Sequence, residues 1–237
     1  MGTFPEVSIV IPCLNEEEAI GECVQKALAG LAAANTSGEV IVVDNGSTDR
    51  SPSIASSLGA RVVTEKRKGY GRALLKGFEE ARGKYILMGD GDGSYDFSAL
   101  EGFVALLRQG YDLVMGSRLK GNILPGAMPW ARRWIGNPAL SGVLRFLFKT
   151  PVSDSHCGLR ALSREACQRM ELKSEGMELA SEMVVAASLN GMKIAEIPIT
   201  YFPRKGRSKL NPARDAWRHI RYMLRAWMLS HGNRSRG

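Results

Sequence analysis

Short apolar, β-branched runs alternate with segments of helical spacing along the first half of this sequence. The apolar runs lie at 7–11, 40–44, 60–65, 85–90 and 112–117, and the helical segments between them at 16–34, 49–58, 70–82 and 97–109. Strand–helix alternation of this kind predicts an α/β fold with a Rossmann-like, mostly parallel sheet flanked by helices. The length of 237 residues is enough for one sizeable core.

The second part of the chain, from about residue 119, is less regular. We expect a helix near 131–148, a polar turn over 154–162, a helix near 178–190, a strand over 193–201 and a basic loop over 202–211. Residues 212–229 carry apolar side chains at helical spacing on one side and arginines on another. This pattern predicts a C-terminal amphipathic helix, so that the chain divides into a domain over 1–211 and a basic helix and tail over 212–237.

Positive charge is concentrated at the C-terminal end. The formal net charge is +8, and residues 201–237 hold ten Lys/Arg against one Asp. Such a segment indicates a polyanionic or membrane-surface partner, but a helix that packs on the body and contacts lipid through its arginines alone fits the pattern equally. The basic–aromatic pattern of an RNA-binding sheet is absent, which argues against a nucleic-acid partner.

Neither a membrane span nor a secretion signal is evident in the sequence. No apolar run approaches ~20 residues, and residues 1–6 lack a basic region followed by an apolar stretch. The four cysteines form no CxxC pair, so the spacing of a zinc or dithiol site is absent. We therefore expect a cytoplasmic protein, peripheral on the cytoplasmic face of the membrane if its basic helix binds lipid.

Polar, glycine-bearing loops follow four of the expected strands. Their sequences are PCLNEEE, NGSTD, GDGDGSYD and GSR. In doubly wound sheets, ligands bind beyond the carboxyl ends of the strands. The loops therefore predict a single site along one edge of the sheet.

Asp90 and Asp92 form a D-x-D pair at the end of one strand. Side chains at i and i+2 of an extended segment point the same way, so the two carboxylates can share a hard cation that also binds phosphate oxygens. A calcium loop of the EF-hand type is disfavoured because Tyr95 occupies the position that requires glycine. We expect Asp96, the third aspartate, to cap a helix that begins at Phe97.

Six stretches in order resemble family 2 glycosyltransferases, and most closely the polyprenyl-phosphate (dolichol-phosphate) mannosyl- and glucosyltransferases. They are VSIVIPCLNEEEAI, EVIVVDNGSTDRS, GYGRALLKGFEEARGKYILMGDGDGSYD, DLVMGSR, DSHCGLRAL and EIPITYFPRKGRSKL. The resemblance runs from about residue 6 to 212. It implies a GT-A fold, a nucleotide-sugar donor, a divalent cation (Mg²⁺ or Mn²⁺) and inversion at the anomeric carbon.

The resemblance also implies roles for residues on the donor side, within a nucleotide-sugar half of about 1–118. Asp44 matches the residue that holds the base, Asp90 the donor-binding aspartate and Asp92 the metal ligand, with both aspartates near the metal. Ser94 stands where the mannosyl enzymes often have a further glutamine ligand, so Asp96 or water would take that place instead. The remaining donor-side matches are the nucleotide loop and a mobile basic loop that closes on the diphosphate: Pro12, Asn15, Glu16, Arg204 and Lys209.

On the acceptor side, a half of about 119–211, the resemblance implies arginines that face a lipid phosphate. Arg118 has this role, together with Arg132 or Arg133. Ser155, Gly158 and Arg160 match the acceptor-side turn. Glu182 is either a catalytic or acceptor residue or a carboxylate on a helix surface.

The function predicted from these residues is transfer of a hexosyl group from a nucleotide-diphosphate sugar to a polyprenyl phosphate. The same fold acting on a soluble acceptor hydroxyl is the alternative, and a non-catalytic nucleotide-binding protein is a third interpretation. Two phosphorylated ligands in one pocket require cations, which the metal and the arginines would supply. The sequence does not specify the sugar, the base or the oligomeric state.

Overall fold

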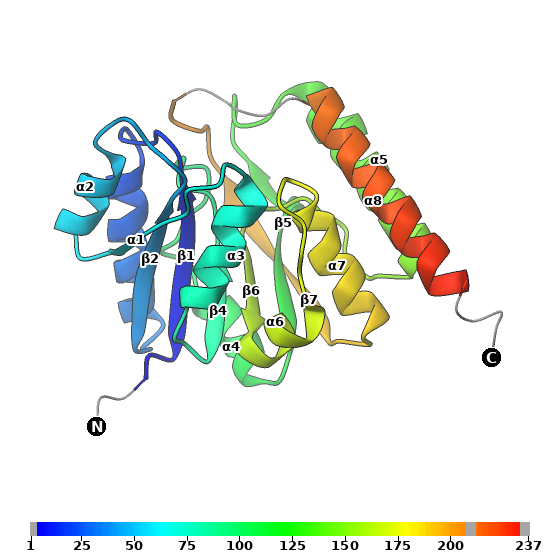
Figure 1. The fold of residues 1–237 in the computed structure, drawn as a ribbon, viewed down its shortest axis with the longest axis horizontal. Coiled ribbons are helices and arrows are strands. Elements are labelled where there is room, and N and C mark those ends of the chain that lie inside the picture. The colour runs from blue at the N-terminus through cyan, green and yellow to red at the C-terminus, as the bar shows by residue number, and fades with distance from the viewer. Residues whose placement is uncertain (1–3, 207–211, 233–237) are drawn as a thin grey trace.

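A seven-stranded sheet forms the centre of the molecule in the computed structural model, which describes residues 4–206 and 212–232 (Figure 1). The strand order is β3-β2-β1-β4-β6-β5-β7. Strand β6 runs antiparallel to both of its neighbours and the other described pairs are parallel, so the expected mostly parallel sheet is confirmed. The strands are β1 Val7–Cys13, β2 Gly38–Asp44, β3 Arg61–Thr64, β4 Tyr85–Met88, β5 Leu113–Ile123, β6 Arg160–Ser163 and β7 Ile194–Tyr201.

Helices cover both faces of this sheet because its central strands are apolar on both sides. Ile9 and Ile11 pack on one face with the core side chains of α1, α2 and α4, whereas Val10 packs on the other with those of α3, α5, α6, α7 and α8. The helices are α1 Ile20–Ala33, α2 Ser51–Ser57, α3 Tyr70–Glu80, α4 Glu101–Arg108, η1 Arg132–Gly136 (a π-helical turn), α5 Asn137–Phe148, α6 Arg164–Met170, α7 Leu179–Leu189 and α8 Pro212–Gly232.

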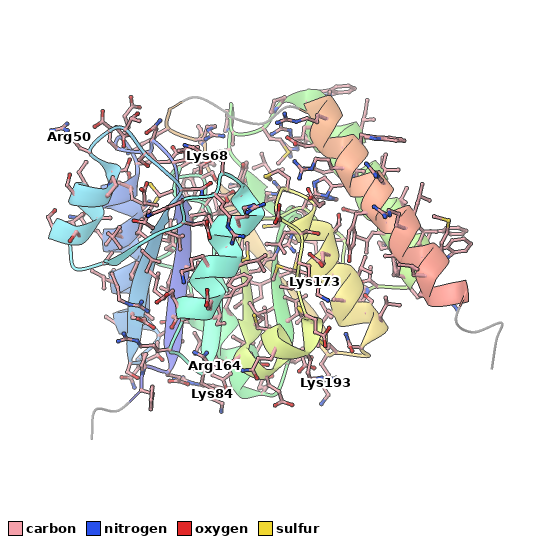
Figure 2. The ribbon with its side chains drawn as sticks, viewed as in Figure 1. Arg50, Lys68, Lys84, Arg164, Lys173 and Lys193 are labelled. Carbon is pink, nitrogen blue, oxygen red and sulfur yellow. The ribbon has the colours of Figure 1, made fainter. Side chains whose placement is uncertain are left out.

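The carboxyl ends of the parallel strands lie at one end of the sheet. Cys13 of β1 pairs with Asp44 of β2, and β4 ends beside Val10 of β1. Figure 2 shows Lys68 near this end and Lys84 at the opposite end. The loops after β1, β2 and β4 are therefore neighbours, as the strand order requires.

Two expectations for local structure were wrong. The stretch predicted as a polar turn over 154–162 ends in strand β6, whose four residues are too short to give a periodic signal and whose Ala161 and Leu162 are buried between β4 and β5. Helix α4 begins at Glu101, because Phe97 turns into the core and Asp96 instead accepts hydrogen bonds from the NH and hydroxyl of Ser98.

The C-terminal amphipathic helix is present and packs against α5 and α7 (Figure 1). Its apolar side divides into two stripes. Met223 is fully buried and Ile220 packs against the core, whereas Trp217, Leu224 and Met228 face outward and are 62%, 45% and 56% exposed. No helix among the described residues has the length and apolar content required to cross a bilayer.

Two glycines inside helices give a matched test of the packing. A Cβ at Gly77 of α3 would meet Val10 Cγ1 at 2.2 Å, whereas a Cβ at Gly142 of α5 would meet nothing within 4 Å. We expect Gly77→Ala to destabilise the protein by about 1–3 kcal/mol through overpacking. Gly142→Ala should be neutral or stabilise by up to about 1 kcal/mol. Urea unfolding of both variants measures this, and equal effects would contradict the packing of α3 on β1.

Candidate active site

Asp90 and Asp92 lie in the turn after β4, and hydroxyl groups orient both carboxylates. The Tyr70 hydroxyl donates to Asp90 Oδ1 over 2.7 Å. The backbone NH and the hydroxyl of Ser94 donate to Asp92 Oδ1 at 3.0 and 2.5 Å. Ser94 therefore orients Asp92. Burial and then the charge of Asp92 raise the pKa of Asp90 from 3.8 to about 6, so the two carboxylates repel each other in a shielded position.

The segment after β7 passes over this turn and brings Arg204 to Asp92. The backbone NH of Lys205 donates to the Asp92 carbonyl at 2.8 Å. Arg204 Nη2 lies 3.4 Å from Asp92 Oδ2 and 3.7 Å from Glu16 Oε1. The structure thus brings Arg204 to the expected donor site, whereas Lys209 lies outside the described residues.

The loops after β1 and β2 are joined by hydrogen bonds beside Asp44. Asn15 adopts a left-handed conformation with φ 50, its NH donates to Ser47 Oγ at 2.9 Å, and its Oδ1 accepts from the Thr48 NH at 2.7 Å. Asp44 Oδ1 accepts from the Ser47 NH at 2.9 Å. The donor-side residues expected from the sequence are therefore together on two adjacent loops: Pro12, Asn15, Glu16 and Asp44.

A cavity of about 420 Å³ extends from the aspartate turn to the space between η1, α5, α7 and α8. The charged side chains of its lining are Asp90, Arg118, Arg132, Arg160 and Asp215. Most of the remaining wall is apolar, with side chains such as Leu74, Met88, Leu140, Leu179, Met183 and Ala216. The cavity therefore combines charged groups beside the carboxylates with a long apolar wall.

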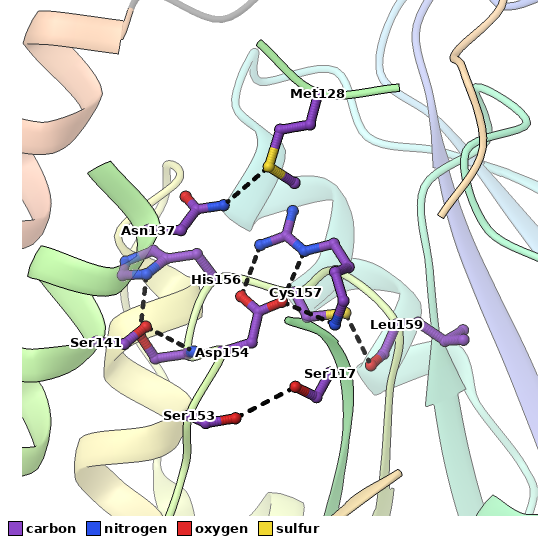
Figure 3. Close-up of polar contacts among 12 residues, drawn as sticks. Ser117, Met128, Asn137, Ser141, Ser153, Asp154, His156, Cys157 and Leu159 are labelled. Atoms are coloured by element: carbon purple, nitrogen blue, oxygen red, sulfur yellow. Dashed lines mark hydrogen bonds and ion pairs between the residues drawn. The ribbon is translucent and has the colours of Figure 1, made fainter. Parts of the chain in front are cut away.

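Arg118 is fixed in this cavity by a buried ion pair with Asp154 (Figure 3). Its Nε and Nη2 donate to the two carboxylate oxygens at 2.8 and 2.7 Å, and its backbone NH donates to Oδ2 at 3.0 Å. The guanidinium also lies over the ring of Tyr201, 5.3 Å from its centroid. Bidentate pairing of this kind holds the arginine rigidly.

Two expected acceptor-side residues hold the backbone around the cavity. Arg160 is fully buried and donates to the carbonyls of Ser155, Cys157 and Ala180 at 2.7–2.8 Å. Burial lowers the pKa of Arg160. Hydrogen bonds to the three carbonyls hold its guanidinium in place. The Ser155 side chain is buried and hydrogen-bonded to Ser141 and His156.

The other acceptor candidates are spread over two elements. Arg132 lines the cavity, whereas Arg133 stacks on Trp134 with its guanidinium carbon 5.0 Å from the ring centroid. Glu182 lies outside the cavity lining, and its carboxylate accepts hydrogen bonds at 3.0 and 2.7 Å from backbone NH groups of residues 173–174. Of these three side chains, the structure brings Arg132 to the cavity.

A chain of hydrogen-bonded side chains ties together the helices that enclose the cavity, and Figure 3 shows part of it. The Ser155 hydroxyl lies 3.0 Å from the hydroxyl of Ser141 on α5 and 2.9 Å from His156 Nδ1. The hydroxyl of Ser181 on α7 continues the series, because it lies 3.3 Å from His156 Nε2 and 2.8 Å from Nδ1 of His219 on α8. Burial lowers the pKa of His219 to about 4 and that of His156 well below 6.5, so both rings are neutral at pH 7. These hydrogen bonds fix α8 as one wall of the cavity.

Three residues of the site were missed by the sequence reasoning: Tyr70, Asp154 and His219. Each acts on a partner in another element, and Tyr70 and Asp90 are twenty positions apart along the chain. The stretches GYGRALL and DSHCGLRAL contain Tyr70 and Asp154, but nothing local indicates their partners. Gly158 is required by close approach, since a Cβ there would lie 2.9 Å from Asp90 Oδ2.

The carboxylate pair fits a hard divalent cation. Within residues 4–206 and 212–232, no cluster of three or more His, Cys, Asp or Glu side chains could hold a metal alone. Mg²⁺ is often bound by one or two carboxylates with the remaining oxygens supplied by phosphates and water. The two aspartates supply that number of ligands, and a cation would offset the burial and the charge of Asp92 that raise the pKa of Asp90.

The mostly parallel sheet flanked by helices, with loops gathered at its strand ends, is a GT-A fold. The chain belongs to glycosyltransferase family 2, because the model of that family, described as "Glycosyl transferase family 2", matches residues 8–170. The expected family, fold and class of enzyme are thereby confirmed.

Curated relatives from Haloferax volcanii are similar over most of this chain. The low-salt glycan biosynthesis hexosyltransferase Agl6 is 47% identical over 93% of the chain and 53% of its own length. A dolichyl-phosphate hexose transferase is 35% identical over 89% of each chain. The present chain thus spans about half the length of the first relative and most of the second.

Solved structures share the fold. Glucosyl-3-phosphoglycerate synthase from Mycobacterium tuberculosis, in complex with phosphoglyceric acid, superposes with a TM-score of 0.72 at 23% identity, covering 94% of this chain and 80% of that one. The same enzyme with Mn²⁺ and UDP-glucose also gives a TM-score of 0.72, at 22% identity over 94% and 79% of the two chains. At this level of identity the likeness concerns the fold.

Removing the charge of Asp90 should stabilise the protein when metal and donor are absent. The pKa of Asp90 is higher in the folded protein than its ordinary 3.8, so the protonated carboxyl stabilises the fold, and this contribution is lost as the pH rises through about 6. We expect Asp90→Asn to raise the Tm at pH 7.5 by on the order of 5 °C. The gain should shrink toward pH 4, as thermal unfolding in EDTA would show. A gain independent of pH would contradict the raised pKa of the buried Asp90 carboxyl.

Proposed function

We propose that this protein transfers a hexosyl group, with inversion, from a nucleotide-diphosphate sugar to a polyprenyl phosphate of the dolichyl or undecaprenyl type. The observation that carries the proposal is the cavity beside Asp90, which joins charged groups to a long apolar wall. An acceptor with an anionic head and an apolar chain matches both parts. The relative named as a dolichyl-phosphate hexose transferase supports the same acceptor class.

The donor would bind across the ends of β1, β2 and β4, in the half of about residues 1–118. Asp44 would hold the base, Asn15 and Glu16 the nucleotide, and Asp90 the sugar. Asp92 with Asp90 would hold Mg²⁺ or Mn²⁺ against the diphosphate. The synthase solved in complex with Mn²⁺ and UDP-glucose binds a donor and a metal of these kinds. Arg204 lies against Asp92 and would bind the diphosphate, and Lys209 is the second cation expected there from the sequence.

The chemistry requires little proton transfer from the protein. An oxygen of the acceptor phosphate attacks the anomeric carbon, and the bond from that carbon to the diphosphate oxygen breaks, so the electron pair leaves with the nucleoside diphosphate. A single displacement inverts the anomeric configuration. The acceptor oxygen is already anionic near pH 7, so a strong general base is unnecessary. Arg204 and the bound metal would stabilise the charge that develops on the leaving group.

Arg118 and Arg132 are the groups suited to the acceptor phosphate in the half of about 119–211. Arg118 is rigid because the Asp154 carboxylate accepts hydrogen bonds from two of its guanidinium nitrogens. The same carboxylate also neutralises the charge of Arg118. Arg132 supplies a further positive charge from η1. With a lipid acceptor, the protein would act at the cytoplasmic face of a membrane as a peripheral protein.

A soluble acceptor is the second candidate. The observation in its favour is the fold shared with a synthase crystallised with phosphoglyceric acid. The arginines at the charged part of the cavity would suit a small phosphorylated or carboxylated acceptor as well. In that case the apolar wall of the cavity would remain without a role.

Replacing one carboxylate near the metal should abolish transfer. We expect Asp92→Asn to lower kcat by at least about 100-fold, because the charge on the leaving group loses its stabilisation. Asp96→Asn is the matched control, since Asp96 lies four residues away and its carboxylate holds only a local turn with Ser98. Transfer of radiolabelled sugar in the presence of Mn²⁺ measures both. Full activity of Asp92→Asn would contradict the metal-dependent mechanism.

Filling the apolar part of the cavity should separate the two acceptor classes. Ala216 of α8 lines this part, and Ala216→Phe should raise the KM for a polyprenyl phosphate about 10-fold or more while the donor KM stays unchanged. Ala32→Phe, on the exposed surface of α1, is the control. Product recovered from the organic phase measures transfer to lipid. Labelled product found only in the aqueous phase would overturn the lipid acceptor and favour the second candidate.

A further inference from the structure

Exposed apolar side chains gather on two neighbouring helical segments. In the described part of the chain, all large exposed apolar residues except Phe4, Leu28 and Leu189 lie on residues 130–148 or on α8. They are Trp130, Trp134, Ile135, Val143 and Phe146 on the first segment, and Trp217, Leu224, Trp227, Met228 and Leu229 on the second. Helices α5 and α8 are in contact and lie side by side at the edge of the molecule opposite α2 (Figure 1). We call this surface the α5–α8 face.

All four tryptophans of the chain belong to the α5–α8 face. Trp130 is 69% exposed, Trp134 59% and Trp217 62%. Tryptophan is usually well buried in globular proteins, whereas it is enriched at the boundary between lipid and water, where its ring lies among the head groups. Phe146 is 85% exposed and would reach the acyl boundary.

The charges of the α5–α8 face are almost all positive. Residues 130–149 contain four basic side chains and no acidic one, and α8 contains four arginines and one aspartate, Asp215. Arg218 is paired with Glu178, which directly precedes α7, and Arg221 and Arg225 are exposed beside the apolar stripe of α8. A second copy docked through the same face would bring these arginines against one another, whereas an anionic lipid surface would neutralise them.

The cavity opens among the same helices. Arg132 and Leu140 line it from η1 and α5, and Ala216 and His219 line it from α8. A membrane against the α5–α8 face would therefore lie beside the apolar wall of the cavity. We propose that this composite face, rather than α8 alone, docks the protein on an anionic lipid bilayer. This docking proposal rests in part on the proposed lipid acceptor. The exposed side chains of the α5–α8 face support it independently of the reaction.

The test uses the 237-residue chain and vesicles that contain no acceptor lipid. We expect cosedimentation with vesicles of phosphatidylcholine and about 30% phosphatidylglycerol at low salt, with binding weakened by high salt. Because every tryptophan lies on the face, its fluorescence should shift to the blue and be quenched by brominated lipid. Binding no stronger than to pure phosphatidylcholine would overturn the proposal.

Matched variants locate the surface. Phe146→Ser should weaken vesicle binding several-fold, whereas Phe4→Ser, which removes a side chain that is 80% exposed at the N-terminal end, should leave it unchanged. Arg221→Glu should weaken binding by roughly five-fold or more, whereas Lys84→Glu, at the lower end of the sheet and away from α8, should not (Figure 2). Equal losses in the control variants would overturn the assignment. So would a dimer in sedimentation velocity that Phe146→Ser dissociates, since a second copy would then cover the face.

The two proposals fail separately. Vesicle binding without transfer to any polyprenyl phosphate would support docking through the α5–α8 face and contradict the proposed lipid acceptor. Transfer to detergent-dispersed polyprenyl phosphate without vesicle binding would support the proposed reaction and contradict the docking surface.

Discussion

Repulsion between two carboxylates at the end of β4 is the constraint around which the site is arranged. Tyr70 and Ser94 orient Asp90 and Asp92, and Arg204 reaches Asp92 from the far end of the chain. Burial and then the charge of Asp92 raise the pKa of Asp90 to about 6, so the ionised form of this carboxyl is disfavoured without a further cation. A divalent cation held by the two aspartates, as proposed for the donor site, would offset this cost.

The grouping of the proposed donor-side residues could be predicted from the sequence because these residues follow strands directly. Pro12, Asn15, Asp44 and Asp90 each lie at or just after the carboxyl end of a parallel strand, and parallel strands bring those ends together. The sheet itself was predictable for the same reason, since its apolar strands carry a strong local signal. Strand β6 was missed because it is four residues long and follows a polar turn.

The acceptor side depends on long-range contacts that no local pattern reveals. The sequence indicates Arg118 but not its partner Asp154, and it places Ser155 and Arg160 in an acceptor-side turn without revealing the buried hydrogen bonds that both make. The apolar residues of α8 appear in sequence as one stripe, yet the body covers Met223 and leaves Trp217 exposed. Only the packing of α8 on α5 and α7 creates both the cavity wall and the exposed α5–α8 face.

The central claim is that the apolar cavity receives the hydrocarbon chain of a phosphorylated lipid. The most direct measurement is the KM for a series of isoprenyl phosphates of increasing chain length, dispersed in one detergent, at a fixed saturating donor concentration. The account predicts that KM falls with each added isoprene unit until the cavity of about 420 Å³ is filled and then levels off, while the donor KM stays constant. A KM independent of chain length would contradict it.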